Sequence, residues 1–173
     1  MRNLFTLVFC LQLSLIGFSQ GKTQEVQQIK NLKEIPTLEL TSPDLNLIHA
    51  QDIEREKNGE LYRIGVCLES NINTNDFGEW NVSNDGSRNW KLRVSSEGAE
   101  ALSFLFSKFV LYGETVLTIR DLNGKLVHKP MTSLDVIDHH MQNAALCFGN
   151  DMVIEINEPS NTQASEIFID RVV

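Results

Sequence analysis

The most constraining part of the sequence is residues 77–111, which contain both tryptophans and close on a long aromatic run. From Trp90 to Val94, apolar side chains alternate with the charged Lys91 and Arg93. A period of two gives one apolar and one charged face, which is typical of a half-buried β-strand. The chain around this strand must therefore supply a second layer that covers its apolar face.

Residues 101–111 form the longest aromatic run and predict a second strand. As a strand, one face would carry Leu102, Phe104, Phe106 and Val110, and the other would carry Ala101, Leu105 and Phe109. A helix is the alternative, but the aromatic residues and the nearby turns favour a strand buried on both sides.

Further short apolar runs predict strands over residues 61–68, 115–120, 126–127, 152–156 and 167–173. Residues 70–76 are rich in asparagine and predict a loop, and Asn123-Gly124 predicts a hairpin turn. Strands that recur at short intervals, without a convincing helix between them, indicate an all-β fold. We expect an antiparallel β-sandwich, Greek-key or jelly-roll-like, over residues 60–173.

The first nineteen residues resemble a secretory signal peptide. Arg2 precedes an apolar stretch from Leu4 to Phe18, and Gly17 and Ser19 are small residues suited to a cut after Ser19. An uncleaved membrane anchor is the alternative, but the run is short for a span. We expect a bacterial secreted or periplasmic protein with no stable membrane insertion after cleavage.

Residues 20–59 are polar and irregular, and predict a partly ordered N-terminal arm or linker that packs on the domain. Within it, Asp44 can cap a short helical turn over Leu45, Leu47 and Ile48. The formal net charge is -8, with no basic cluster, which argues against a nucleic-acid partner.

Several segments together resemble the N-terminal pro-region of secreted bacterial lysyl-endopeptidase-type, trypsin-like serine protease precursors. They are FGEW, DGSRNWKLRVSSEGA, FLFSKFVL, GETVLTIR and GNDMVIEINEP, and the resemblance extends from about Tyr62 to Val173. It implies a signal peptide and a β-rich pro-region ahead of a catalytic domain.

These residues contain no Gly-Asp-Ser-Gly-Gly nucleophile segment and leave no room for the two barrels that hold a Ser-His-Asp triad. Ser95, Ser96 and Ser103 have no paired histidine or aspartate in a motif, so no catalytic residue is assigned. We expect a non-catalytic domain that chaperones, inhibits or targets a secreted serine protease, from a truncated or split precursor or as a stand-alone relative. The alternative is a stand-alone extracellular module that binds carbohydrate or another protein. We expect no cofactor.

One cluster of metal-ligand types occurs, at Asp135, Asp138, His139 and His140, with His128 upstream. Imidazole and carboxylate suit a divalent ion, but adjacent histidines on a strand point to opposite faces. A solvated loop is the alternative. Oxygen donors also occur in loops without the spacing of a calcium loop, and we interpret them as turn formers: Asp76, Asn84, Asp85 and Asp151.

Trp80, Trp90 and Tyr112 are candidates for a sugar-stacking platform. The alternative is that the tryptophans pack in the core, and Trp90 is in phase with the apolar strand face. Trp80 and Tyr112 therefore remain as the stacking candidates.

Cys67 and Cys147 remain once the signal peptide is removed, and an extracellular pair is a disulfide candidate. Two separate buried thiols are the alternative, because a sequence gives no distance between them.

Overall fold

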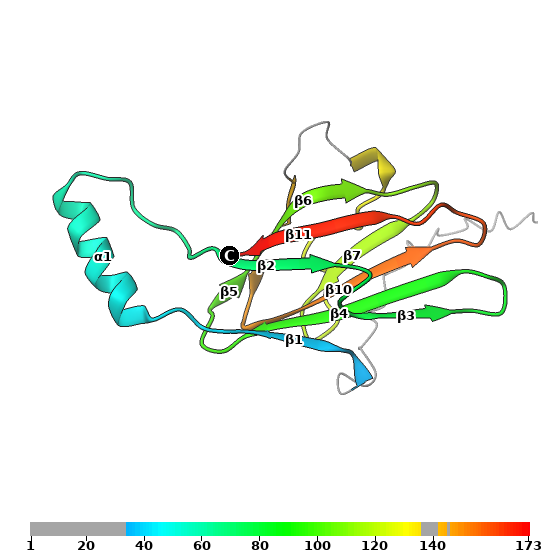
Figure 1. The fold of residues 1–173 in the computed structure, drawn as a ribbon, viewed down its shortest axis with the longest axis horizontal. Coiled ribbons are helices and arrows are strands. Elements are labelled where there is room, and N and C mark those ends of the chain that lie inside the picture. Colours follow the sequence, from blue (N-terminus) through cyan, green and yellow to red (C-terminus); the bar gives the residue numbers. More distant parts are fainter. Residues whose placement is uncertain (1–33, 136–141, 145) are drawn as a thin grey trace, which may run out of the picture.

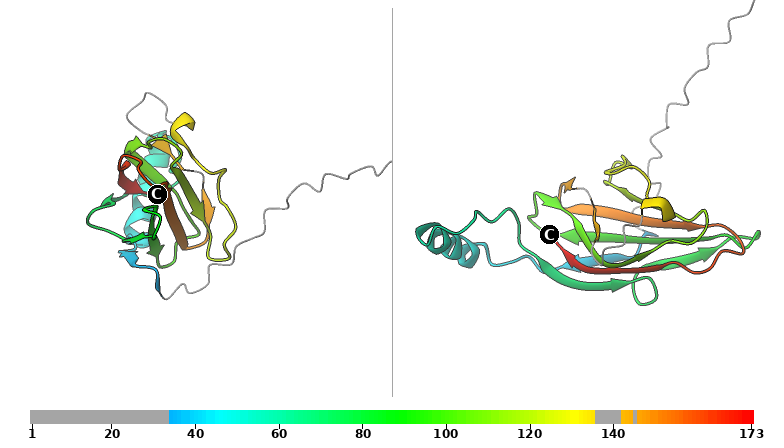
Figure 2. Two further views of the ribbon diagram at one scale, coloured as in Figure 1. Left: turned by 90° about the vertical axis from the view of Figure 1, so that its right-hand side faces the viewer. Right: turned by 90° about the horizontal axis from the view of Figure 1, so that it is seen from above.

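The computed structural model describes residues 34–135, 142–144 and 146–173. The signal peptide predicted over residues 1–19 lies outside them. Two β-sheets pack face to face as a sandwich, and one helix projects from its end (Figures 1 and 2). The predicted all-β sandwich is therefore confirmed.

The larger sheet has five strands. They are β1 (Thr37–Leu40), β3 (Glu79–Val82), β4 (Arg88–Ser96), β7 (Val116–Arg120) and β10 (Asp151–Glu158). The order is β1-β4-β10-β7, and β3 also pairs with β4. β1 runs parallel to β4 along Arg93–Ser96, whereas β3 runs antiparallel to β4 along Arg88–Lys91. Because β10 pairs with β4 over its length, β1 and β3 share the opposite edge of β4.

The smaller sheet has four strands in the order β2-β11-β6-β8. They are β2 (Leu68–Asn73), β6 (Phe104–Val110), β8 (Gln142–Asn143) and β11 (Glu166–Val172). β5 (Ala101–Leu102) and β9 (Cys147–Phe148) pair with each other at one end, and a short 3₁₀ helix covers Ser133–Asp135. The C-terminal strand is thus central in its sheet, between β2 and β6.

The alternation along β4 produces the core as the sequence predicts. Trp90, Leu92 and Val94 are buried, while Lys91 and Arg93 between them are half-exposed. Ile154 and Ile156 of β10 lie in the same cluster. The smaller sheet supplies the other half of that cluster through Ile72, Phe104, Phe106, Ile167 and Ile169.

The aromatic run is a strand, as predicted, but its phase changes midway. Phe104 and Phe106 are buried, and so is Phe109, which the simple alternation placed on the other face. The register with β11 shifts between Phe168 and Ile169, so an extra residue is accommodated in β6. A β-bulge of this kind turns the following side chain inward.

The hairpin at Asn123-Gly124 is confirmed. β7 ends at Arg120, and the backbone NH of Asp121 donates to the carbonyl of Lys125 at 3.0 Å. The predicted return strand over residues 126–127 is reduced to a bridge between Arg120 and Leu126.

The strand predicted over residues 61–68 is wrong. Strand β2 begins only at Leu68 and continues through the asparagine-rich residues that predicted a loop. Leu61, Tyr62 and Ile64 are 87–99% exposed, so their apolar character does not reflect core burial.

Between β1 and β2 the chain leaves the sandwich and returns, and we call residues 41–67 the α1 projection. Its helix α1 (Leu45–Lys57) has 13 residues, where the sequence predicted a single turn. In Figures 1 and 2 it stands clear of both sheets. Since β1 before it belongs to the larger sheet, the sandwich includes part of the predicted N-terminal arm.

Candidate functional site

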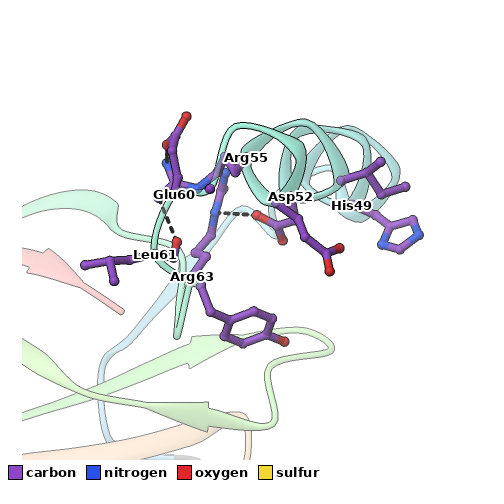
Figure 3. Close-up of a pocket in the computed structure, with 10 residues that line it drawn as sticks. His49, Asp52, Arg55, Glu60, Leu61 and Arg63 are labelled. Atoms are coloured by element: carbon purple, nitrogen blue, oxygen red, sulfur yellow. Dashed lines mark hydrogen bonds and ion pairs between the residues drawn. The ribbon is translucent and has the colours of Figure 1, made fainter.

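The α1 projection encloses a cavity of about 480 Å³ between the helix and the returning chain (Figure 3). The helix contributes His49, Asp52, Ile53, Arg55 and Glu56 to its walls, and the returning chain contributes residues 59–63. Because both walls belong to the projection, the cavity depends on how the helix and the return are held together.

Local signals fix both ends of the helix. The Asp44 carboxylate accepts hydrogen bonds from the backbone NH groups of Asn46 (3.0 Å) and Leu47 (3.2 Å), which is an N-cap. After Lys57 the chain reverses at Gly59, whose φ of +70° favours glycine. The Gly59 NH then donates to the carbonyl of Glu56 at 3.0 Å.

Ion pairs and hydrogen bonds tie the return to the helix (Figure 3). Arg63 Nε lies 3.0 Å from Asp52 Oδ1, and Arg63 Nη2 donates to Gln51 Oε1 at 3.0 Å. Arg55 Nη1 lies 3.0 Å from Glu60 Oε2, and Arg55 Nη2 donates to the carbonyl of Leu61 at 3.1 Å. These contacts turn the polar groups of the projection toward one another.

The large apolar side chains of the projection are exposed, including some that line the cavity. Helix α1 has no buried residue, and Ile64 on the return is 99% exposed. The other strongly exposed apolar residues are Leu45, Leu47, Ile53, Leu61 and Tyr62. Several large apolar side chains exposed on one element indicate an interaction surface.

The base of the projection rests on the end of the sandwich. The Ser42 hydroxyl donates to the carbonyl of Glu97 at 2.5 Å. A smaller cavity of about 190 Å³ lies there. Its walls come from residues 42–45 and 65–68, at the two ends of the projection, and from residues 96–102 of the sandwich.

Trp80 belongs to the larger sheet, and Tyr112 follows a strand of the smaller one. Trp80 lies in β3 of the larger sheet, paired with Trp90, and its Nε1 donates to the carbonyl of Thr74 at 2.9 Å. Tyr112 follows β6 of the smaller sheet, and its hydroxyl donates to Glu166 Oε1 at 3.3 Å.

The face of the Trp80 ring is also partly occupied. The guanidinium carbon of Arg88 lies 5.2 Å from the ring centroid, within the range of a cation–π contact. Arg88 forms an ion pair with Glu158, whose side chain is fully buried and also accepts from the Ser165 NH at 2.7 Å. A sugar ring that stacks on this face would have to displace an anchored guanidinium.

Three of the candidate metal ligands, Asp138, His139 and His140, lie outside the described residues. Asp135 forms an ion pair with Lys129 and accepts from the NH of Thr132 at 2.9 Å. The Lys129 contact, followed by the bonds from Thr132, lowers the pKa of Asp135 to about 2. Within the described ranges, no grouping of His, Cys, Asp or Glu could hold a metal ion.

Asp76, Asn84 and Asp85 lie in turns as the sequence predicts, whereas Asp151 is the buried first residue of strand β10 and not a turn former. Asp85 Oδ1 accepts from the NH (2.9 Å) and the hydroxyl (2.7 Å) of Ser87, and these bonds lower its pKa. Asp76 accepts from Asn73 Nδ2 at 2.7 Å, and Asp151 forms an ion pair with Arg93 at 2.7 Å.

The proposed disulfide is not formed in the structure. Cys67 is exposed on the return of the α1 projection, whereas Cys147 is buried in β9, and both thiols are free. Burial raises the pKa of the Cys147 thiol. The bridge was predicted with Cys67 inside a core strand, and that strand is absent.

The α1 projection is the feature that the sequence reasoning missed. Its signals were present in the sequence: a capping aspartate at Asp44 and, thirteen residues later, Lys57-Asn58-Gly59 as a helix end.

The described part of the chain contains no helix with the length and apolar character needed to cross a membrane.

Comparison with known proteins gives no family: no family model matches this chain. Among solved structures, the isomalto-dextranase of Arthrobacter globiformis T6, complexed with panose, is similar at 12% identity and a TM-score of 0.24. The match covers 54% of this chain and 17% of that one. Similarity at this level gives no basis for transferring a fold or an activity.

Proposed function

We propose that this protein is a non-catalytic, secreted protein-binding module that docks on a trypsin-like serine protease catalytic domain. The α1 projection is the docking element. Through it, the sandwich would chaperone, inhibit or target the protease, as the resemblance to a protease pro-region implies.

The observation that carries this proposal is the set of large apolar side chains that the α1 projection exposes. Leu61, Tyr62 and Ile64 on the return are 87–99% exposed, and the pairs Arg63–Asp52 and Arg55–Glu60 join the return to the helix. Exposing large apolar side chains on a segment that packs on neither sheet is unfavourable unless a partner covers them. Aromatic and aliphatic residues of this kind are typical anchors of protein interfaces.

Carbohydrate binding remains the second candidate from the sequence, but the site geometry supports it less well. Trp80 and Tyr112 lie on different sheets, and Arg88 covers a face of Trp80. Protein binding is therefore the function that the geometry favours.

Binding to a catalytically inactive lysyl-endopeptidase catalytic domain tests the proposal. Tyr62→Ser and Ile64→Ser together should weaken binding by at least about tenfold, equivalent to ~1.4 kcal/mol. Leu134→Ser is the matched control, because Leu134 is 94% exposed but lies outside the α1 projection. Equal affinities for the wild type, the double variant and the control, or no binding by any of them, would contradict the proposal.

A further inference from the structure

We propose that the peptide bond between Lys57 and Asn58, at the tip of the α1 projection, is a processing site for an endopeptidase that accepts lysine. Lys57 is the last residue of α1, and its side chain is 67% exposed. Asn58 and Gly59 after it are also exposed. The only described ion pair of Lys57 is a 3.5 Å contact with the exposed Glu54, which leaves the lysine free to enter a binding pocket.

The segment around this bond opens easily. A peptidase binds several residues in an extended form, so a folded substrate must first unfold locally. Unwinding the end of α1 transfers no buried apolar side chain to water, because the helix has none. The cost is limited to a few helical hydrogen bonds and the polar contacts of Arg55 with the return, and exposed tips of this kind are preferred sites of cleavage.

The other basic residues of the described chain are poorer sites. Six of them lie inside paired strands: Arg88, Lys91, Arg93, Lys108, Arg120 and Arg171. Cleavage next to these residues would require part of a sheet to separate.

The remaining four are also constrained. Lys125 is held in the hairpin turn by its NH and carbonyl bonds to Asp121, and Lys129 precedes Pro130. On the projection itself, Arg55 and Arg63 use their guanidinium groups to hold the return. Lys57 is thus the one basic residue among those described that is both unconstrained and outside a strand.

The reaction is a simple hydrolysis. One water molecule adds across the amide, the carbonyl carbon of Lys57 becomes a carboxylate, and the nitrogen of Asn58 leaves as an amine. No oxidant or reductant takes part.

The cut would disable the projection without releasing the N-terminal piece. Thr37–Leu40 stay paired with β4, and Ile35 is buried, so the fragment is retained without a covalent link. At the tip, however, polar contacts such as the Gly59–Glu56 and Glu60–Arg55 hydrogen bonds join the two sides of the cut, and α1 has no buried side chain to hold them, so the new chain ends can separate. If the projection docks on a protease, as proposed above, separation of the two sides of the cut should abolish docking. This step rests on the proposed function.

Timed digestion of the full chain with trypsin and with a lysine-specific endopeptidase, followed by intact mass measurement, tests the site. Within residues 34–173, the first product should be cut after Lys57, and both fragments should coelute in size-exclusion chromatography. Lys57→Gln should abolish that product, whereas the matched variant Lys125→Gln should leave it unchanged. A first cut elsewhere in residues 34–173, or the same product from Lys57→Gln, would overturn the processing site.

The link to docking is measured separately, by binding of the nicked chain to the inactive catalytic domain. Loss of binding on nicking, with binding retained by the intact chain, supports the switch. Unchanged binding by the nicked chain would refute the switch while leaving the cleavage result intact. If the intact chain does not bind, the proposed function fails, and the digestion result still decides the processing site.

Discussion

The sandwich buries most of its large apolar side chains, whereas the α1 projection exposes its own. In the sandwich, Trp90 and Phe104 are fully buried and charged side chains such as Lys91 lie outside. In the projection, Asp52 and Arg63 face each other and Ile64 is almost fully exposed. Burial of apolar surface therefore stabilises the first region, and capping and ion pairs hold the second.

This difference implies two separate levels of stability in one chain. Exposed ion pairs contribute at most about 1 kcal/mol each, whereas a buried aromatic side chain contributes several. The projection should therefore open locally while the sandwich stays folded. Variants in each region can test that separation.

The largest effect is expected for Trp90→Ala. The indole is fully buried, and its Nε1 donates to the carbonyl of Phe77 at 2.8 Å. Truncation should lower the free energy of unfolding by about 3–5 kcal/mol, which is much of the stability of a typical domain. Denaturant unfolding measures the loss. Trp80→Ala is the control, because its ring is only half-buried, and a loss as large as that of Trp90→Ala would contradict this picture.

A smaller effect is expected for Gly78→Ala, compared with Gly98→Ala. Both glycines have positive φ, at +72° and +76°, so alanine strains the backbone at either position. Only at Gly78 would the new Cβ clash, at 2.6 Å from the Trp90 ring and from the carbonyl of Lys91.

Gly78→Ala should therefore cost about 1–3 kcal/mol more than Gly98→Ala, as overpacking does in a core. The difference between their unfolding midpoints in denaturant measures this excess. Equal midpoints would show that the close contact between Gly78 and Trp90 can relax.

Sequence periodicity predicted the elements that the core holds. The alternation from Trp90 to Val94 and the Asn123-Gly124 turn both depend on residues that are close in the sequence, and both occur in the structure. The bulge in β6 could not be predicted, because it depends on the pairing with β11. The apolar run over residues 61–68 was misleading because Leu61, Tyr62 and Ile64 are exposed, and apolar composition alone does not distinguish an exposed segment from a core strand.

The candidate site was predictable only in part. Asp44 was recognised as a cap, but the length of α1 was not, because the helix lacks the apolar stripe that marks a packed helix. The contacts of Arg55 and Arg63 join residues on both sides of a turn, and no periodic pattern encodes them. Trp80 and Tyr112 were grouped by residue type alone, and the fold places them on different sheets.

The smallest global effect is expected for Asp44→Ala, which removes the N-cap of α1. Loss of such a cap costs a helix about 0.5–2 kcal/mol. Because α1 buries no side chain, this cost should appear as fraying of the helix and not as unfolding of the sandwich. Amide exchange at Asn46 and Leu47 should become faster, while the tryptophan-monitored thermal midpoint should match that of the wild type. Ser42→Ala is the control, since it removes a contact at the base of the projection and leaves the cap in place. A lower midpoint for Asp44→Ala would show that the projection and the sandwich unfold as one unit, which would end the two-level description.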